Sequence, residues 1–125
     1  MKQTILVADD DRDIRELVVF KLEQSGYGVI EAEDGAAALV AARLHRPDLC
    51  VLDVMMPGLS GVEVIRELRR DQGCADVKVI LLTARAQEAD VETGFSVGAD
   101  DYVVTPFSPR ELVSRVQAVL ARSSA

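Results

Sequence analysis

The sequence predicts an α/β protein, a doubly wound parallel sheet covered by helices on both faces. Two observations support this fold class. Short apolar runs alternate along the chain with helical patterns, five of each, as parallel strands joined by helical crossovers require. The apolar runs are nearly continuous rather than alternating, which is typical of strands buried on both faces of a sheet.

The predicted strands are short, and turn-forming or polar residues follow them. They cover Ile5–Ala8, Val29–Ile30, Leu49–Leu52, Val77–Leu82 and Tyr102–Val104. Asp34 and Gly35 close the second run, and Pro106 ends the fifth because proline cannot donate a ladder hydrogen bond.

Helical patterns occupy the segments after these strands, and residues that favour helix ends mark their limits. The first helix is predicted to begin at Asp11 or Arg12 and to end at Gly26 and Gly28. The second covers 36–45 before Pro47, the third follows a loop that ends at Gly61, and the fourth covers 87–97. The last has Ser108 as its N-cap and Pro109 in its first position.

Apolar residues at helical spacing predict which helix faces pack against the sheet. These faces comprise Ile14, Leu17, Val18 and Leu22 in the first helix, Val62, Ile65 and Leu68 in the third, and Leu112, Val116, Val119 and Leu120 in the last. Residues 122–125 are expected to fray.

The composition argues against several classes of partner. Among 125 residues, 21 are Asp or Glu and 14 are Lys or Arg, so the formal net charge is -7. Direct binding of nucleic acid or of anionic lipid needs a basic surface and is not expected. No apolar run approaches the roughly 20 residues that span a bilayer, and no signal-peptide core is present, so a cytoplasmic protein is expected. The length fits one domain over residues 1–125.

Acidic side chains follow two of the predicted strands. Asp9, Asp10 and Asp11 come directly after the first strand, and Asp53 follows the third. Because the carboxyl ends of parallel strands meet at one edge of a sheet, these carboxylates are expected to converge there. Such a cluster raises pKa values or binds a cation, and oxygen ligands suit Mg²⁺. A hydroxyl at Thr83, after the fourth strand, could donate to a phosphoryl oxygen, and Asp53 could act as a nucleophile.

A purely structural role remains open for part of this acidic run. Asp is favoured at helix starts, so Asp10, Asp11 or Asp13 could serve only as caps. The structural explanation is weaker for Asp53, because it follows four apolar residues and a buried carboxylate is costly without a metal or hydrogen bonds.

Four motifs in this order resemble the receiver domain of two-component response regulators. They are ILVADDD at 5–11, LDVMMPG at 52–58, LLTA at 81–84 and GADDY at 98–102. The resemblance covers essentially the whole chain and implies a flavodoxin-like sheet with strand order 2-1-3-4-5. It also implies that Asp53 is the phosphoacceptor, which receives a phosphoryl group from a sensor histidine kinase or a phosphotransfer protein.

The same resemblance implies further roles for particular residues. Asp9, Asp10, Asp53 and the backbone carbonyl of Met55 would hold Mg²⁺. Thr83 and Tyr102 would form the switch, while Met55 and Arg85 occupy positions that tune the lifetime of the aspartyl phosphate. The activity implied is Mg²⁺-dependent self-phosphorylation and autodephosphorylation rather than that of an enzyme acting on other substrates.

A homodimer is a further implication, through the fourth helix, the fifth strand and the fifth helix. Four charged residues on this face could form salt bridges either between two copies or within one chain: Asp100, Asp101, Glu111 and Arg115.

One position departs from the family pattern. Thr105 stands where receivers carry the lysine of a Lys-Pro pair, and that lysine would contact Asp53 and then the phosphoryl group. Two functions therefore remain open: a phosphoryl-accepting receiver, and a pseudo-receiver or switch-impaired variant that acts through protein–protein contacts. A Mg²⁺-dependent aspartyl-phosphate hydrolase is disfavoured, because Met55 stands where such enzymes carry a second acid.

Overall fold

The computed structural model describes residues 2–84 and 88–122, in which five strands and five helices alternate. The strands are β1 (Thr4–Ala8), β2 (Gly28–Ala32), β3 (Leu49–Asp53), β4 (Lys78–Ala84) and β5 (Asp101–Thr105). The helices are α1 (Arg12–Gln24), α2 (Gly35–His45), α3 (Gly61–Arg70), α4 (Glu88–Val97) and α5 (Pro109–Arg122). Neighbouring strands are parallel in the order β2-β1-β3-β4-β5, which confirms the predicted fold class and strand order.

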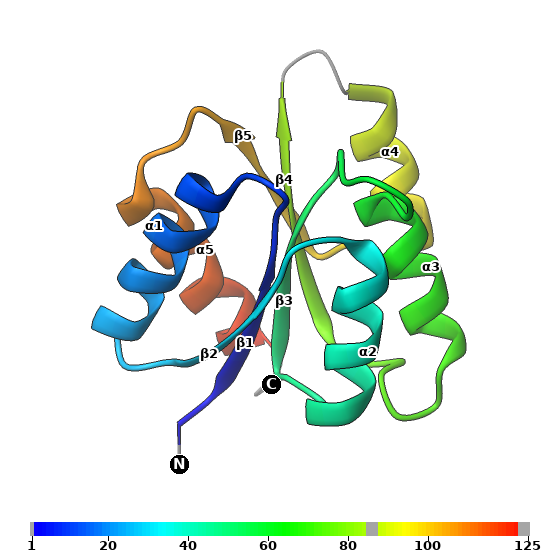
Figure 1. Cartoon of the computed structure of the whole chain (residues 1–125), viewed down its shortest axis with the longest axis horizontal. Helices are drawn as coiled ribbons and strands as arrows, with labels where there is room; N and C mark the ends of the chain where they lie inside the picture. The colour runs from blue at the N-terminus through cyan, green and yellow to red at the C-terminus, as the bar shows by residue number, and fades with distance from the viewer. Residues whose placement is uncertain (1, 85–87, 123–125) are drawn as a thin grey trace.

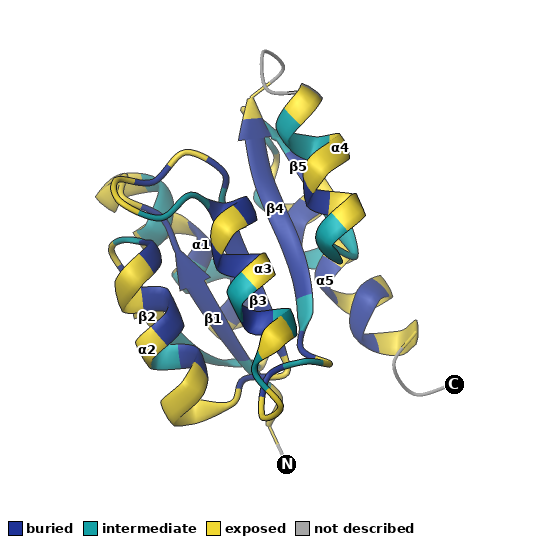
Figure 2. Cartoon of the chain, turned by 90° about the vertical axis from the view of Figure 1, so that its right-hand side faces the viewer, coloured by how far each residue is buried: buried dark blue, intermediate teal, exposed yellow. Residues whose placement is uncertain are grey.

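Helices cover both faces of the sheet, and the apolar core has two layers. Figure 1 shows α1 and α5 on one face and α2, α3 and α4 on the other. Successive strand residues point to opposite faces, so that Ile5 packs in the layer under α1 and α5 while Leu6 packs in the layer under α2 and α3. Figure 2 shows buried residues along the strands and on the inner sides of the helices. The carboxyl ends of all five strands consequently lie along one edge.

Several strand limits differ from the sequence expectation. Both β2 and β5 extend beyond their apolar runs, because ladder pairing with a neighbour continues at residues such as Gly28 and Thr105. Gly28 is therefore the first residue of β2. The prediction that it ends the first helix was wrong. The fourth strand begins at Lys78, one residue later than predicted, and it continues through Thr83.

Most of the predicted inner helix faces are buried, with one exception in α1. Val18 and Leu22 are buried, whereas Leu17 is 45% exposed and the prediction for it was wrong. Leu17 therefore lies at the border of the apolar stripe of α1, on its solvent side. Residue 87, predicted to lie in the fourth helix, and residues 123–125, predicted to fray, are outside the described residues. Within the described part of the chain, no helix combines the length and apolar character needed to cross a membrane.

Arg69 of α3 joins segments that are distant in the sequence. Its Nη1 donates to the carbonyl oxygens of Ala75 and Val77 at 3.1 and 2.6 Å, and its Nη2 donates to that of Gly98 at 2.6 Å. The Asp100 carboxylate lies 3.6 Å from Nη2 and accepts the backbone N–H of β4 at Val79. One guanidinium thus holds α3 to the segments that precede β4 and β5.

Replacing Arg69 by methionine should lower the free energy of unfolding by about 2–4 kcal/mol, because three partly buried carbonyls lose a charged donor. The neighbouring Arg70 is the matched control, since its side chain is 69% exposed and pairs with Glu67 of the same helix at 3.6 Å. Arg70→Met should change stability by less than about 0.5 kcal/mol. Urea denaturation of both variants measures the difference, and equal losses would contradict the assignment.

Candidate functional site

The structure brings three predicted acidic side chains together at the carboxyl edge of the sheet. Carboxylate oxygens of Asp9, Asp10 and Asp53 all lie within 4.8 Å of one another. Asp9 follows the last residue of β1 and is 2% exposed, whereas Asp53 is the last residue of β3 and is partly buried. Because β1 and β3 are neighbours in the sheet, residues 44 positions apart meet at their ends.

Backbone contacts hold Asp9 in place, and Asp11 is a helix cap. The N–H of Asp9 donates to the carbonyl of Ala32 at 3.2 Å, and its Oδ1 accepts the N–H of Asp11 at 2.9 Å. The Asp11 carboxylate accepts the backbone N–H groups of Asp13 and Ile14 at the start of α1. The capping explanation therefore applies to Asp11, while Asp10 belongs to the acidic cluster.

Asp53 lies at a close approach between β3 and the start of α3. Its Oδ1 accepts the N–H of Met55 at 3.3 Å. A Cβ on Gly61 would lie 2.5 Å from the Asp53 carbonyl oxygen, so glycine is required there for α3 to begin so close to the strand end. The Met55 side chain is 62% exposed.

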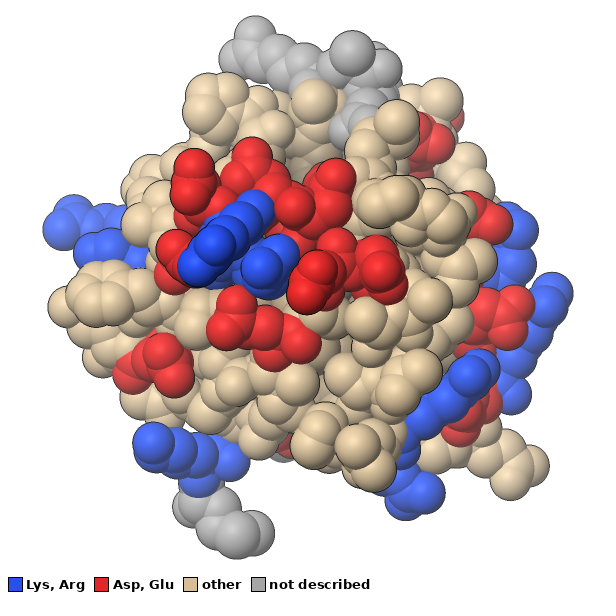
Figure 3. Space-filling model, viewed as in Figure 1, with Lys and Arg blue, Asp and Glu red and all other residues tan. Residues whose placement is uncertain are grey.

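The electrostatics of the cluster favour protonation or a bound cation. Burial, followed by the charge of Asp9, raises the pKa of Asp53 to about 7. Burial also raises the pKa of Asp9, although the N–H of Asp11 opposes this shift. A hydrogen bond between the two carboxyl groups raises the pKa of Asp53 and lowers that of Asp9, so the two groups titrate together. Figure 3 shows acidic side chains gathered on this face of the molecule, with basic side chains among them.

The donor set fits Mg²⁺. The clustered ligand atoms are carboxylate oxygens, which hard divalent cations prefer. The raised pKa values of Asp9 and Asp53 reflect partly buried carboxylates crowded together, and such a cation would relieve this excess of negative charge.

The predicted switch residues lie on β4 and β5. Thr83 is 2% exposed, and its hydroxyl donates to the carbonyl of Ala84 at 3.2 Å. The Thr105 hydroxyl donates to the carbonyl of Thr83 at 3.2 Å, across the end of the β4–β5 pair, and a cis peptide bond follows Thr105. Tyr102 is 37% exposed and contacts Phe95 of α4 edge-to-face, with ring centroids 5.7 Å apart.

The remaining predicted residues divide between pairs within the chain and one undescribed position. Arg115 lies 3.2 Å from Asp101 and 3.6 Å from Glu111, and Asp100 pairs with Arg69. These charges are therefore paired within one chain in this structure. Arg85 lies outside the described residues.

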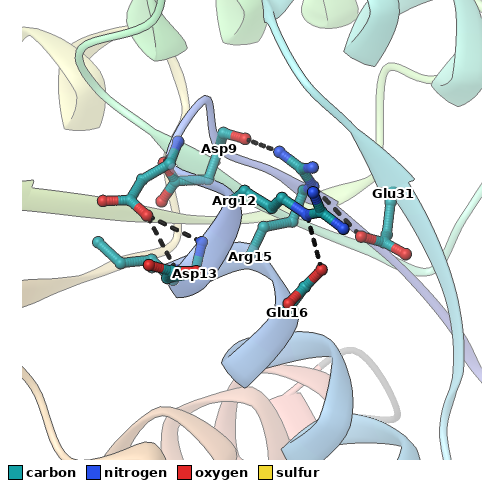
Figure 4. Close-up of polar contacts among 8 residues, drawn as sticks. Asp9, Arg12, Asp13, Arg15, Glu16 and Glu31 are labelled. Atoms are coloured by element: carbon teal, nitrogen blue, oxygen red, sulfur yellow. Dashed lines mark hydrogen bonds and ion pairs between the residues drawn. The ribbon is translucent and has the colours of Figure 1, made fainter.

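The sequence analysis missed two residues next to the cluster, Arg15 and Glu31. Figure 4 shows the Arg15 guanidinium between the Asp9 backbone and Glu31. Nη1 donates to the Asp9 carbonyl at 2.8 Å, and Nε lies 3.2 Å from Glu31 Oε1. A signal was present, because Arg15 lies one turn after the cap Asp11, and helical side chains lean back toward the preceding turn.

Comparison with known proteins shows which described family the chain matches. A family model for the response regulator receiver domain matches residues 5–117. The phosphate regulon transcriptional regulatory protein PhoB of Pseudomonas aeruginosa is 47% identical over 121 residues, which are 97% of this chain and 53% of that protein. The alkaline phosphatase synthesis transcriptional regulatory protein PhoP of Bacillus subtilis is 48% identical over 123 residues, or 98% of this chain and 50% of that protein. The chain thus spans about half the length of these curated relatives.

Solved structures show the same architecture over the whole domain. The chemotaxis protein CheY4 of Vibrio cholerae superimposes with a TM-score of 0.90 at 32% identity, covering 95% of this chain and 99% of that chain. A CheY-like receiver domain protein of Methanospirillum hungatei gives a TM-score of 0.93 at 25% identity, covering 99% of this chain and 98% of that chain.

The raised pKa of Asp53 should make the stability of the metal-free protein depend on pH. The folded protein holds the Asp53 proton up to about pH 7, whereas the unfolded chain releases it near 3.8. This stabilising contribution is complete below the unfolded value and is lost as pH rises through the folded value. Asp53→Asn removes the charge, so in EDTA it should stabilise only slightly at pH 5, which is just above the unfolded pKa, and by about 1–2 kcal/mol at pH 8.

Thermal unfolding of wild type and variant at both pH values measures this difference. Glu92→Gln, an exposed acid on α4, is the control and should have the same small effect at pH 5 and pH 8. If the stabilisation by Asp53→Asn does not increase from pH 5 to pH 8, the raised pKa of Asp53 is contradicted.

Proposed function

Because the chain belongs to the response regulator receiver domain family, we propose that it accepts a phosphoryl group on Asp53 in a two-component signalling pathway. The donor would be the phosphohistidine of a sensor kinase or a phosphotransfer protein in the cytoplasm. The observation that carries the proposal is the convergence of Asp9, Asp10 and Asp53 within 4.8 Å at the carboxyl edge of the sheet.

Each acid has a distinct task in this proposal. Asp9, Asp10, Asp53 and the Met55 carbonyl would hold Mg²⁺. When bound, this ion supplies positive charge that offsets the carboxylates and the phosphoryl oxygens. Asp53 must be deprotonated before its oxygen can attack phosphorus, and burial next to Asp9 raises its pKa to about 7. A new P–O bond to Asp53 then forms while the P–N bond to the donor histidine breaks.

The switch would begin at Thr83, which is buried at the end of β4. Its hydroxyl would turn from the Ala84 carbonyl, 3.2 Å away, toward a phosphoryl oxygen on Asp53. Tyr102 lies on β5, where its backbone is in register with Leu81, and it would move inward as Thr83 moves. The Tyr102–Phe95 contact is edge-to-face and half exposed, so little packing opposes such a rotation.

The output surface would be formed by α4, β5 and α5, and a second copy of this chain could pair with it. Phe95 is 44% exposed and Tyr102 is 37% exposed, so both present apolar area on this face. Two of the similar proteins are named as transcriptional regulators, so control of a transcriptional output is the class of response that we propose.

Thr105 favours a second candidate, a switch-impaired or pseudo-receiver. Its hydroxyl contacts the Thr83 carbonyl, and its side chain is uncharged and too short to replace a lysine at Asp53. Phosphoryl transfer needs charge neutralisation that a cation can supply, but the contact from β5 to the phosphoryl group would be missing. Acceptance of the phosphoryl group and coupling to the output are therefore separable in this chain.

Acetyl phosphate with Mg²⁺ should label the wild-type protein once, on Asp53, as measured by intact-protein mass spectrometry. Asp53→Asn and excess EDTA should each abolish labelling, because the nucleophile or the neutralising charge is removed. Asp10→Asn should raise the Mg²⁺ concentration needed by about tenfold, and Glu92→Gln should leave it unchanged. Wild-type protein that remains unlabelled would refute phosphoryl acceptance.

Beryllofluoride with Mg²⁺ should shift the backbone NMR signals of Thr83 and Tyr102 in the wild-type protein. Thr105→Lys should bind beryllofluoride about tenfold more tightly, since a charge-assisted hydrogen bond contributes about 1.5 kcal/mol. Thr105→Val is the size-matched control and should not bind more tightly. A response of Tyr102 that occurs only in Thr105→Lys would support the switch-impaired candidate in place of a working switch.

A further inference from the structure

The contact between Arg15 and the acidic loop is not explained by helix stability. Arg15 is in α1, yet its guanidinium does not point to solvent: the side chain is 13% exposed. Its donors reach two other segments, the Asp9 carbonyl after β1 at 2.8 Å and Glu31 of β2 at 3.2 Å. One side chain therefore ties α1 to the ends of two neighbouring strands.

Arg12 shows what an ordinary arginine of this helix does. Its side chain is 79% exposed and pairs with Glu16 one turn later, at 2.9 Å. It contributes to the same acidic and basic surface, but its ion-pair partner Glu16 lies on its own helix. Arg12 thus provides an internal comparison for Arg15, because it has the same residue type and a similar ion pair on the same helix.

Arg15 completes the immobilisation of Asp9. The N–H of Asp9 is held by Ala32, and its carboxylate is held by the N–H of Asp11. The carbonyl of Asp9 is the remaining polar group, and Arg15 is its donor. With all three groups held, the direction of the Asp9 carboxylate is set, and so is the start of the peptide that leads to Asp10.

Glu31 directs the guanidinium. Its backbone is in register with Val7 of β1, so its side chain starts beside the strand that carries the acidic loop. Because the donors of a guanidinium form a rigid fork, an ion pair at Nε leaves Nη1 in a defined direction. Here that direction leads to the Asp9 carbonyl. The charge of Arg15 is largely matched by Glu31, so the pair acts on the site through geometry.

We propose that Arg15, oriented by Glu31, is a positioning residue for the Mg²⁺ ligands Asp9 and Asp10. This inference rests on the proposed phosphoryl-accepting function, since it assigns how that site is held ready for the ion. Groups that orient metal ligands typically change metal affinity by about 10- to 100-fold when removed. An effect on a carbonyl belongs near the lower end of that range.

The test is a Mg²⁺ titration of the full chain at constant pH, followed by the NMR signals of Asp10 and Asp11. Arg15→Met keeps the apolar stem and removes the donors, and it should raise the Kd for Mg²⁺ about tenfold. Glu31→Gln should raise it less, because the amide oxygen still accepts from Nε. Arg12→Met should leave the Kd within twofold of the wild-type value. Arg15→Lys should recover part of the affinity, because one ammonium can reach the carbonyl.

A second readout needs no metal and separates positioning from general loss of structure. Hydrogen exchange of the Asp11 amide, which is bonded to Asp9 Oδ1, should become several-fold faster in metal-free Arg15→Met. Exchange of core strand amides such as Val51, and of the same Asp11 amide in Arg12→Met, should not change.

The outcomes distinguish this inference from the proposed function. Wild-type protein that binds no Mg²⁺ would refute the proposed function. Wild-type protein that binds Mg²⁺, together with an Arg15→Met Kd within twofold of it, would refute only the positioning assignment. An equal loss of affinity in Arg12→Met would also refute it, because the effect would then arise from surface charge.

Discussion

The site depends on one constraint, which is that negatively charged carboxylates meet at one edge of the sheet. Parallel strands place Asp9 and Asp53 side by side because β1 and β3 are neighbours, and Asp10 adds a third carboxylate. In the metal-free protein, burial and this repulsion raise the pKa of Asp53. A divalent cation would remove it more completely, so metal affinity and the reactivity of Asp53 have the same electrostatic origin.

The structure around this cluster resists the repulsion by holding the backbone. Asp11 caps α1 and so fixes where the acidic loop ends. Gly61 allows α3 to begin against the carbonyl of Asp53. Arg15 donates a hydrogen bond to the carbonyl of Asp9. The carboxylates can therefore remain close together without a separate positively charged partner for each of them. Their oxygens are thus available to a ligand.

Thr105 changes the connection between two halves of the site, the acidic half with Asp53 and the half with Thr83 and Tyr102. Its hydroxyl joins β5 to the backbone of Thr83, so a contact between strands stands where a lysine would reach the acids. Under the proposed function, the acidic half with Asp53 would still accept the phosphoryl group. The half proposed to transmit the signal, with Thr83 and Tyr102, would then depend on fewer contacts to that group.

Much of this protein follows from local sequence, and the rest depends on contacts between distant segments. Periodicity and strand-end residues determined the five-stranded parallel fold and the convergence of Asp9, Asp10 and Asp53, because the residue after each buried strand must lie at the carboxyl edge. The departure at Thr105 came from the resemblance to the receiver family. Chain-local patterns did not determine the exposure of Leu17 or the extra residues of β2 and β5, since these depend on what packs alongside. Only the tertiary structure decided that the pKa of Asp53 is raised, that Thr105 contacts Thr83, and that Arg15 reaches Asp9 and Glu31. Each of these depends on burial or on side-chain directions across separate elements, which no local spacing specifies.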